Sequence, residues 1–367
     1  MTREIPGRDG SQAKKRKVNV VSAWTVLPRD LIIKIAFSIP DAADLFSFLK
    51  ALLSFNVLGP LKHLHDLGLK QKHRDLWPCL RLNTATLVSR FKSSYDVIAK
   101  YYSSVLIHDV TDVKWLRKHL NPAVQVEWIA GGLPIPQEIL DEWTELRITR
   151  LNGYFYRENT SALTHVFPRL PHLSSFVMDV KDTFDHVCAL LPHCALLTDL
   201  KLLCMTGPKV KESNLLDLAA WLSSKPVQKF SFDAWDSWKN ISIAVRQKFY
   251  EAMVNCPTMD ELTLYTTGAN GLDFSKFNFS MRSLDTYHAN WQFIESMAGR
   301  LEGSRVTDLK IFACHAREKS AYEALLKVLP KTSIKSLRWH NIKLDQEQWR
   351  EFVPLLAKCT LERLTLH

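Results

Sequence analysis

The segment VQKFSF, residues 227–232, recurs in altered form as MDELTL at residues 259–264, and this pattern decides the fold. In each copy an apolar residue is followed by two variable positions, a second apolar residue, one variable position and a third apolar residue. Short apolar and polar alternation of this kind is typical of a strand. Between the two copies, residues 242–256 place apolar side chains three and four positions apart, which indicates an amphipathic helix. The unit is therefore a strand followed by a helix.

The six-residue pattern occurs repeatedly from residue 77 to residue 366. From residue 173 onward, the first positions of successive copies lie between 22 and 32 residues apart. A period in this range is the sequence signature of a solenoid built from one supersecondary unit per repeat. The copies are Trp77-Leu80-Leu82, Tyr102-Val105-Ile107, Ala123-Val126-Trp128, Trp143-Leu146-Ile148, Leu173-Phe176-Met178, Leu197-Leu200-Leu202, Val227-Phe230-Phe232, Met259-Leu262-Leu264, Met281-Leu284-Thr286, Val306-Leu309-Ile311, Ile334-Leu337-Trp339 and Leu361-Leu364-Leu366.

The gaps between copies add further helices, at residues 212–225, 318–330 and 345–359. Repeated strand and helix units bury their apolar faces by stacking into a parallel sheet covered by helices. In its period and apolar pattern this part of the chain resembles leucine-rich-repeat proteins, although it lacks the Asn that commonly follows the strand in that family. The resemblance implies an α/β solenoid with parallel strands on the concave face and helices on the convex face.

One position of the repeat carries a row of candidate binding residues. In a leucine-rich-repeat geometry the apolar positions point into the core, and the variable positions face the concave side. The position after the third apolar residue is occupied, in five consecutive repeats, by Asp233, Tyr265, Tyr287, Phe312 and His340. Lys310 and Arg338 occupy nearby variable positions. Aromatic residues among mixed charges are typical of a protein-binding surface.

We predict that these seven residues contact a target protein. The alternative is that the aromatic side chains pack under the loop or helix that follows each strand, and Phe312 fits this alternative best.

The N-terminal part of the chain has a different organisation. Residues 26–53 read VLPRDLIIKIAFSIPDAADLFSFLKALL. Pro28 stands where the first turn of a helix tolerates proline, and Pro40 with Asp41 ends this helix and begins a second one. The two helices carry more apolar side chains than a small helix pair can bury alone, which indicates a partner surface.

This stretch resembles an F-box, the helical module that docks a substrate receptor onto the adaptor subunit of SCF-type ubiquitin ligases. Leu27-Pro28, Asp30-Leu31, the Ile32 and Ile35 pair, Ile39-Pro40 and Asp44-Leu45 fall where the family has its characteristic residues. Many members have a Val-Cys-x-x-Trp-like third element, whereas this chain reads Phe48-Leu49-Lys50-Ala51-Leu52. The resemblance implies an adaptor-docking face formed by Leu27, Pro28, Leu31, Ile32, Ile35, Leu45 and Leu49. The alternative is a helical cap that closes the first open edge of the repeats.

Part of the net charge is local to the N-terminus. The chain has a net charge of +10, and Lys14, Lys15, Arg16 and Lys17 lie within a polar arm without periodicity. This run resembles a nuclear-import signal that an import receptor reads, although short basic runs also occur as solvated tails. The rest of the chain mixes both signs, so we do not expect nucleic-acid binding. The predicted organisation is a disordered basic arm at 1–23, an F-box-like module at 24–72 and the repeat solenoid at 73–367.

The sequence contains no pattern that indicates catalysis. A phosphate-binding loop, a nucleophile elbow, an H-E-x-x-H helix and a C-x-x-C pair are all absent from it. His186, Cys188, His193 and Cys194 cannot converge on one metal ion from a single helix. We therefore expect neither an enzyme nor a cofactor.

Seven scattered cysteines, the lack of a long apolar run and the lack of a secretory signal favour the reducing interior of the cell, in the nucleus, the cytoplasm or both.

Together these features predict a non-enzymatic substrate receptor of a cullin-RING ubiquitin ligase. The F-box-like helices would bind the adaptor and the repeats would bind a target protein, a combination that is common in the family. The alternative is a leucine-rich-repeat interaction scaffold whose N-terminal helices only cap the repeats.

Overall fold

The computed structural model describes residues 27–130, 137–154, 166–179, 184–203, 210–313, 319–342 and 345–367. The chain divides into two compact units, Met1–Pro78 and Cys79–His367. The first unit is helical in its described part, and the second contains the sheet.

The helical unit begins with the two helices that the sequence predicts. Asp41 caps the second of them, because its Oδ1 accepts hydrogen bonds from the backbone N–H groups of Ala43 (2.7 Å) and Asp44 (3.0 Å). The elements are α2 (Arg29–Ala36), α3 (Ala42–Leu52), η1 (Leu53–Phe55), α4 (Leu61–Gly68) and α5 (His73–Leu76).

The core of the helical unit contains three of the residues that were predicted to dock the adaptor. Ile32, Leu45 and Leu49 have no exposed surface. Helices α3 and α4 approach closely at Gly68, where a Cβ would lie 2.1 Å from the Phe46 ring. Packing of this kind fixes which face of each helix remains exposed.

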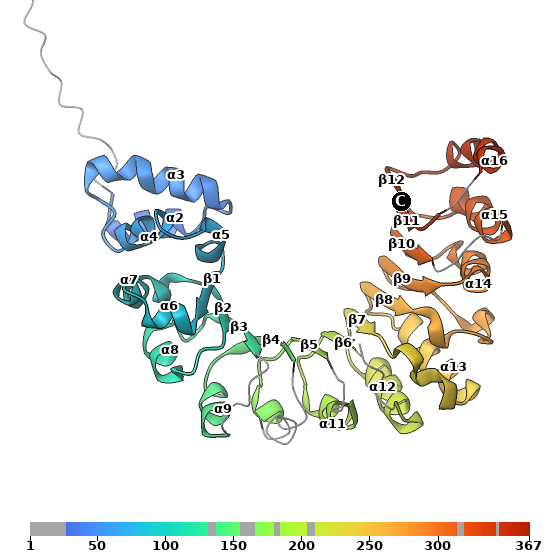
Figure 1. The fold of residues 1–367 in the computed structure, drawn as a ribbon, viewed down its shortest axis with the longest axis horizontal. Coiled ribbons are helices and arrows are strands. Elements are labelled where there is room, and N and C mark those ends of the chain that lie inside the picture. Colours follow the sequence, from blue (N-terminus) through green and yellow to red (C-terminus); the bar gives the residue numbers. More distant parts are fainter. Residues whose placement is uncertain are drawn as a thin grey trace, which may run out of the picture. The chain divides into compact units, whose positions relative to one another are not determined.

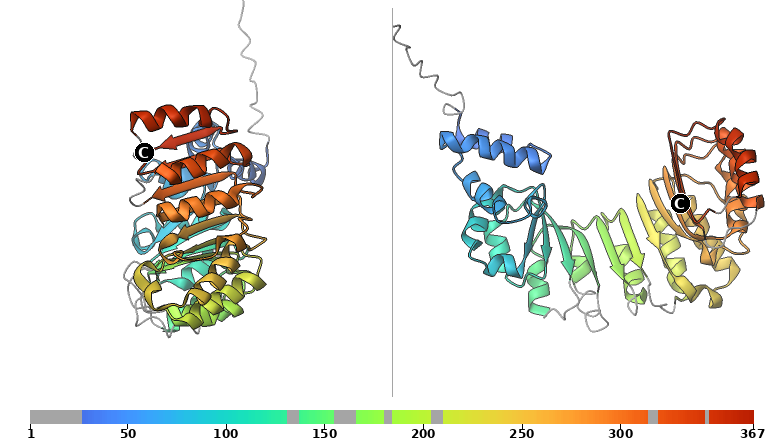
Figure 2. Two further views of the ribbon diagram at one scale, coloured as in Figure 1. Left: turned by 90° about the vertical axis from the view of Figure 1, so that its right-hand side faces the viewer. Right: turned by 45° about the horizontal axis from the view of Figure 1, so that its top comes forward.

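The second unit contains one sheet of twelve parallel strands, whose order in space is their order in the sequence. Figures 1 and 2 show the strands side by side and the helices along one face of the sheet. This arrangement confirms the predicted α/β class with a parallel sheet and is compatible with a repeat solenoid. The strands are β1 (Leu80–Asn83), β2 (Ser104–His108), β3 (Gln125–Ala130), β4 (Ile148–Tyr154), β5 (Ser175–Asp179), β6 (Asp199–Leu203), β7 (Lys229–Phe232), β8 (Glu261–Tyr265), β9 (Ser283–Ala289), β10 (Asp308–Ala313), β11 (Ser336–His340) and β12 (Arg363–Leu366).

Helical segments lie between successive strands, as the amphipathic stretches predict. The α-helices are α6 (Thr84–Val88), α7 (Lys92–Ile98), α8 (Val113–His119), α9 (Gln137–Trp143), α11 (Phe184–Leu190), α12 (Glu212–Ser224), α13 (Ile243–Val254), α14 (Trp291–Leu301), α15 (Lys319–Val328) and α16 (Gln346–Leu356). The short 3-10 helices are η2 (Ala99–Tyr101), η4 (Phe167–Arg169), η5 (Leu191–His193), η6 (Trp235–Asn240), η7 (Thr266–Gly268), η8 (Phe274–Lys276) and η9 (Leu329–Lys331).

The fourth copy of the repeat pattern is displaced from its predicted position. The sequence assigned Leu146 and Ile148 to the inward positions of this strand. In the structure Ile148 lies opposite Val126, and Leu151 lies opposite Trp128. A register shift after Val126 adds a residue to β4, so the buried pair is Ile148 and Leu151, and Leu146 precedes the strand.

The two faces of the sheet differ because side chains alternate along each strand. In β8, Leu262 and Leu264 are buried, whereas Glu261, Thr263 and Tyr265 are partly exposed. Buried aromatic residues connect the strands to the helices, as Phe232 on β7 does where its ring lies 5.6 Å from that of Phe249 on α13. We call the side opposite these contacts the open face of the sheet.

Gly268 provides a test of how tightly this core is packed. A Cβ at Gly268 would lie 2.4 Å from the buried indole of Trp238, whereas a Cβ at Gly299 in α14 would meet nothing within 4 Å. We expect Gly268→Ala to destabilise the protein by about 1–3 kcal/mol through overpacking. Gly299→Ala should leave stability unchanged or raise it by up to about 1 kcal/mol, because alanine favours the helix. Thermal unfolding of the two variants measures the difference, and equal unfolding temperatures would contradict the close approach.

Candidate functional site

The open face carries three rows of side chains that cross strands β8 to β11. Parallel pairing in register places Glu261, Thr263 and Tyr265 of β8 opposite Ser283, Asp285 and Tyr287 of β9. The same register continues from β9 to β10 and from β10 to β11. Residues that are 20 to 30 positions apart in sequence are therefore neighbours on this face.

The third row is a continuous stack of rings, which we call the aromatic ladder. It consists of Tyr265, Tyr287, Phe312, His340 and His367. Successive ring centroids are 5.1, 4.3, 4.2 and 4.4 Å apart, and the interplanar angles are 16°, 8°, 9° and 14°. Four of the predicted target-binding residues thus form one surface, and Phe312 stacks within the ladder.

The fifth ring was missed by the sequence reasoning although the signal was present. His367 directly follows Leu366, the third apolar residue of the last repeat, as His340 follows Trp339. It therefore satisfies the rule that identified Tyr265, Tyr287, Phe312 and His340.

Asp233 lies at the other end of this row. Phe232 on β7 pairs with Leu264 on β8, so the next residue, Asp233, is level with Tyr265. Burial raises the pKa of Tyr265 to about 12, and the charge of Asp233 and the neighbouring Tyr287 contribute to the shift. The phenol of Tyr265 therefore remains protonated at neutral pH and can donate a hydrogen bond.

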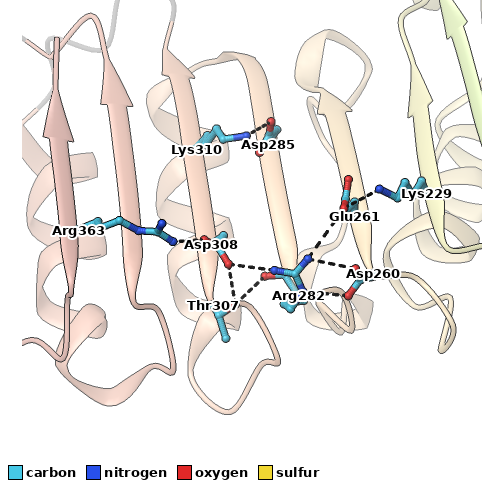
Figure 3. A network of polar contacts seen from close by, with 9 residues as sticks. All are labelled: Lys229, Asp260, Glu261, Arg282, Asp285, Thr307, Asp308, Lys310 and Arg363. Carbon is cyan, nitrogen blue, oxygen red and sulfur yellow. Dashed lines mark hydrogen bonds and ion pairs between the residues drawn. The ribbon is translucent and has the colours of Figure 1, made fainter. Parts of the chain in front are cut away.

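Most charges on the open face are paired with one another. Figure 3 shows Arg282 between Asp260 and Asp308, with its Nε and Nη2 each 3.2 Å from an oxygen of Asp260 and its Nη1 3.4 Å from Asp308. Arg363 lies 3.3 Å from the other oxygen of Asp308. Exposed pairs of this type contribute little to stability. Their main effect is to neutralise the surface.

Two further pairs belong to the same set. Lys229 lies 2.8 Å from Glu261, and Lys310 lies 2.7 Å from Asp285. The predicted target contact Lys310 is therefore held by Asp285. Arg338 lies opposite Lys310 in the register and is exposed, and among the described residues it makes no ion pair. Lys310 and Arg338, which the sequence treated alike, thus differ in whether a carboxylate neutralises their charge.

The predicted adaptor-docking residues also fall into two groups. Ile32, Leu45 and Leu49 are core residues of the helical unit. Leu31 and Ile35 lie one turn apart on α2 and keep exposed surface, with Leu31 42% exposed. Leu27 and Pro28 precede the helix and also keep exposed surface, and we call these four residues the α2 strip.

A second apolar surface of the helical unit was not predicted. A groove of about 270 Å³ lies between α3, α4 and α5. The stacked rings of Phe46 and His73 lie in it, with centroids 3.8 Å apart, and Leu69, which is 67% exposed, stands beside them. Sequence periodicity could not show this groove because it depends on how three helices meet.

The basic run at the N-terminus and the cysteines add nothing to the candidate site. Lys14, Lys15, Arg16 and Lys17 lie outside the described residues. Burial raises the pKa of the Cys188 thiol, and it raises the pKa of the Cys194 thiol to about 11. Both thiols therefore remain protonated at neutral pH. Across the described parts of the chain, no three metal-ligating side chains come together and no helix is long and apolar enough to cross a membrane.

Comparison with known proteins does not assign this chain to a family. No family model and no curated protein matches this sequence. Among the 56 chains of solved structures that match is one described as "Leiomodin-1 Actin-Binding Site 2 (ABS2)", with a TM-score of 0.24 and 19% sequence identity. The match covers 35% of this chain and 65% of that chain. A likeness of this extent gives no information on what the present chain binds.

The aromatic ladder should show energetic coupling between adjacent rings only. Aromatic pairs contribute about 0.5–1.5 kcal/mol beyond the area that they bury. A double-mutant cycle of Tyr287→Leu and Phe312→Leu should therefore give a coupling energy of this size, measured by denaturant unfolding. The control cycle uses Tyr265→Leu and His340→Leu, because these residues do not stack on each other, and it should be additive within about 0.5 kcal/mol. Equal coupling in both cycles would show that the ladder does not act through ring contacts.

Proposed function

We propose that this protein is a non-enzymatic substrate receptor of an SCF-type cullin-RING ubiquitin ligase. In this proposal the helical unit docks the ligase adaptor and the repeats, which resemble leucine-rich repeats, hold a target protein on the open face. Ubiquitin transfer is carried out by other subunits, so the chain needs no catalytic group of its own.

The observation that carries the proposal is the exposed apolar surface of the helical unit. Leu31, Leu53, Phe55 and Leu69 are large apolar side chains that are exposed in a module of fewer than 80 residues. Apolar side chains that are exposed next to one another indicate a partner surface, and Leu31 and Ile35 lie one turn apart on α2 with both at least partly exposed. The α2 strip includes residues that match the opening Leu-Pro and Asp-Leu of the F-box family, Leu27, Pro28 and Leu31.

The burial of Ile32, Leu45 and Leu49 narrows the proposed docking face. These three side chains hold α2 and α3 together and contact the adaptor only if the helices separate. The proposed contacts are therefore Leu27, Pro28, Leu31 and Ile35.

The competing proposal is a leucine-rich-repeat scaffold without a ligase. Its helical unit would cap the repeats, and its exposed apolar side chains would have no adaptor to contact. A purified adaptor subunit distinguishes the two proposals, since only the receptor binds it.

Leu31→Asp should reduce adaptor binding at least about tenfold, because it places a charge in the centre of an apolar contact. Val88→Asp is the matched control, since Val88 is 78% exposed and lies in the other unit. Binding of the full chain to purified adaptor can be measured by calorimetry, and the unfolding temperatures of both variants check that they remain folded. If the unaltered chain does not bind the adaptor, or if Leu31→Asp binds as well as Val88→Asp, the docking proposal fails.

We also propose nuclear import through Lys14, Lys15, Arg16 and Lys17. Replacing the four residues by alanine removes the positive charge that an acidic receptor groove reads. A fluorescent fusion of the full chain should then move from the nucleus to the cytoplasm. An unchanged distribution would assign this run to a solvated tail.

A further inference from the structure

Among the described residues, the charges on the open face of β8 to β12 are paired except at Arg338. Lys310 is held by Asp285, while Arg282 and Arg363 share Asp308. Arg338 stands beside Lys310 in the register and is exposed to solvent. Among the residues that the structure describes, no carboxylate lies within ion-pair distance of its guanidinium. The positive charge of Arg338 is therefore not compensated by a described side chain.

The aromatic ladder adds to the preference for a negative partner. Its rings stack face to face, so all ring faces except the outer faces of Tyr265 and His367 are covered by a neighbouring ring of the ladder. The edge of an aromatic ring carries the positive part of its quadrupole, whereas the face carries the negative part. Cations prefer ring faces. The ladder is thus better suited to carboxylate and carbonyl oxygens than to a lysine or arginine.

Two histidines lie near Arg338 on the open face. His340 lies two residues after Arg338 on β11, so both side chains point to the open face about 7 Å apart along the strand. His367 stacks on His340 from the next strand position. Arg338 and the two imidazoles therefore lie at the same end of the ladder.

His340 is poised to take up a proton when a negative group arrives. Burial lowers its pKa below the usual value, and the positive charges of His367 and Arg338 lower it further. Phe312 stacks on its other side and is uncharged. The backbone oxygen of His367 accepts a hydrogen bond from Ile342 N–H at 3.3 Å. No described acidic side chain opposes these positive groups at His340.

We propose that the end of the open face formed by Arg338, His340 and His367 binds a carboxylate of an extended acidic segment of the target protein, whose neighbouring apolar side chains lie along the aromatic ladder. The proposal rests on the proposed function, in which the open face holds the target, and it specifies the chemistry of that target. The ladder crosses five strand positions, or roughly 19 Å, which an extended segment of about six residues spans.

The arrangement also fixes how binding depends on pH. A bound carboxylate offsets the repulsion from Arg338 and His367, so the pKa of His340 is higher in the complex than in the free protein. A group whose pKa rises on binding is protonated as the ligand binds, and affinity therefore increases as the pH falls through that higher pKa. Binding should be tighter near pH 6 than near pH 8.

A phage library of random peptides of about twelve residues, panned against the full chain near pH 6, tests the proposal without a known target. Enriched peptides should carry Asp or Glu next to aromatic or aliphatic residues. Synthetic versions should bind Arg338→Gln about 10- to 100-fold more weakly, as expected when a charged hydrogen bond is lost. Lys201→Gln is the control. Lys201 is exposed and lies in the same row of the open face as Arg338, but on β6, away from the aromatic ladder. Its binding should equal that of the unaltered chain.

Several results would overturn the proposal. They are an absence of enriched peptides, enrichment of basic or uncharged peptides, equal binding by the two variants, or affinity that does not rise at lower pH. Adaptor binding by Arg338→Gln is measured on the same preparation and should be unchanged. A chain that selects acidic peptides but does not bind the adaptor would refute the ligase proposal and leave the acidic ligand in place. A chain that binds the adaptor but does not select acidic peptides would refute only the acidic ligand.

Discussion

Register between parallel strands is the constraint on which the rest of the repeat unit depends. Each strand places one set of side chains in the core and the alternate set on the open face, and pairing in register repeats this choice from β8 to β11 as far as the aromatic ladder, after which the register of β9 and β10 shifts beyond Phe312. A shift of one residue would bury Tyr287 and expose Leu284. The buried leucines that fix the register therefore also align the aromatic ladder and the ion pairs, although they do not touch a ligand themselves.

The sequence was sufficient for the repeat, because apolar spacing reports directly on which side chains face the core. It placed eleven strands correctly and misplaced the inward residues of β4, since the extra residue near Ile148 leaves no mark in the apolar pattern. The ion pairs could not be predicted from the sequence. Arg363 and Asp308 are 55 residues apart, and only the paired strands bring them together. Without this pairing, the distinction between Lys310 and Arg338 cannot be read from the sequence.

The helical unit shows a different limit of sequence reasoning. Its first two helices were predicted, but a short helix with apolar residues on several sides does not reveal which side is buried. The packing of α2 against α3 settles this, and it divides the seven predicted docking residues into three that build the unit and four that remain for a partner. The functional proposal is more specific as a result, because the α2 strip is a smaller surface than the sequence indicated.

The two proposed surfaces lie on separate units, so binding at one should not require contact at the other. The central claim is that the α2 strip is the docking surface for a ligase adaptor. Hydrogen exchange of the full chain, measured with and without purified adaptor, tests it most directly. The account predicts slower amide exchange across residues 27–36 on adding the adaptor, with β8 to β12 unchanged. Unchanged exchange in α2, or protection confined to the sheet, would contradict it.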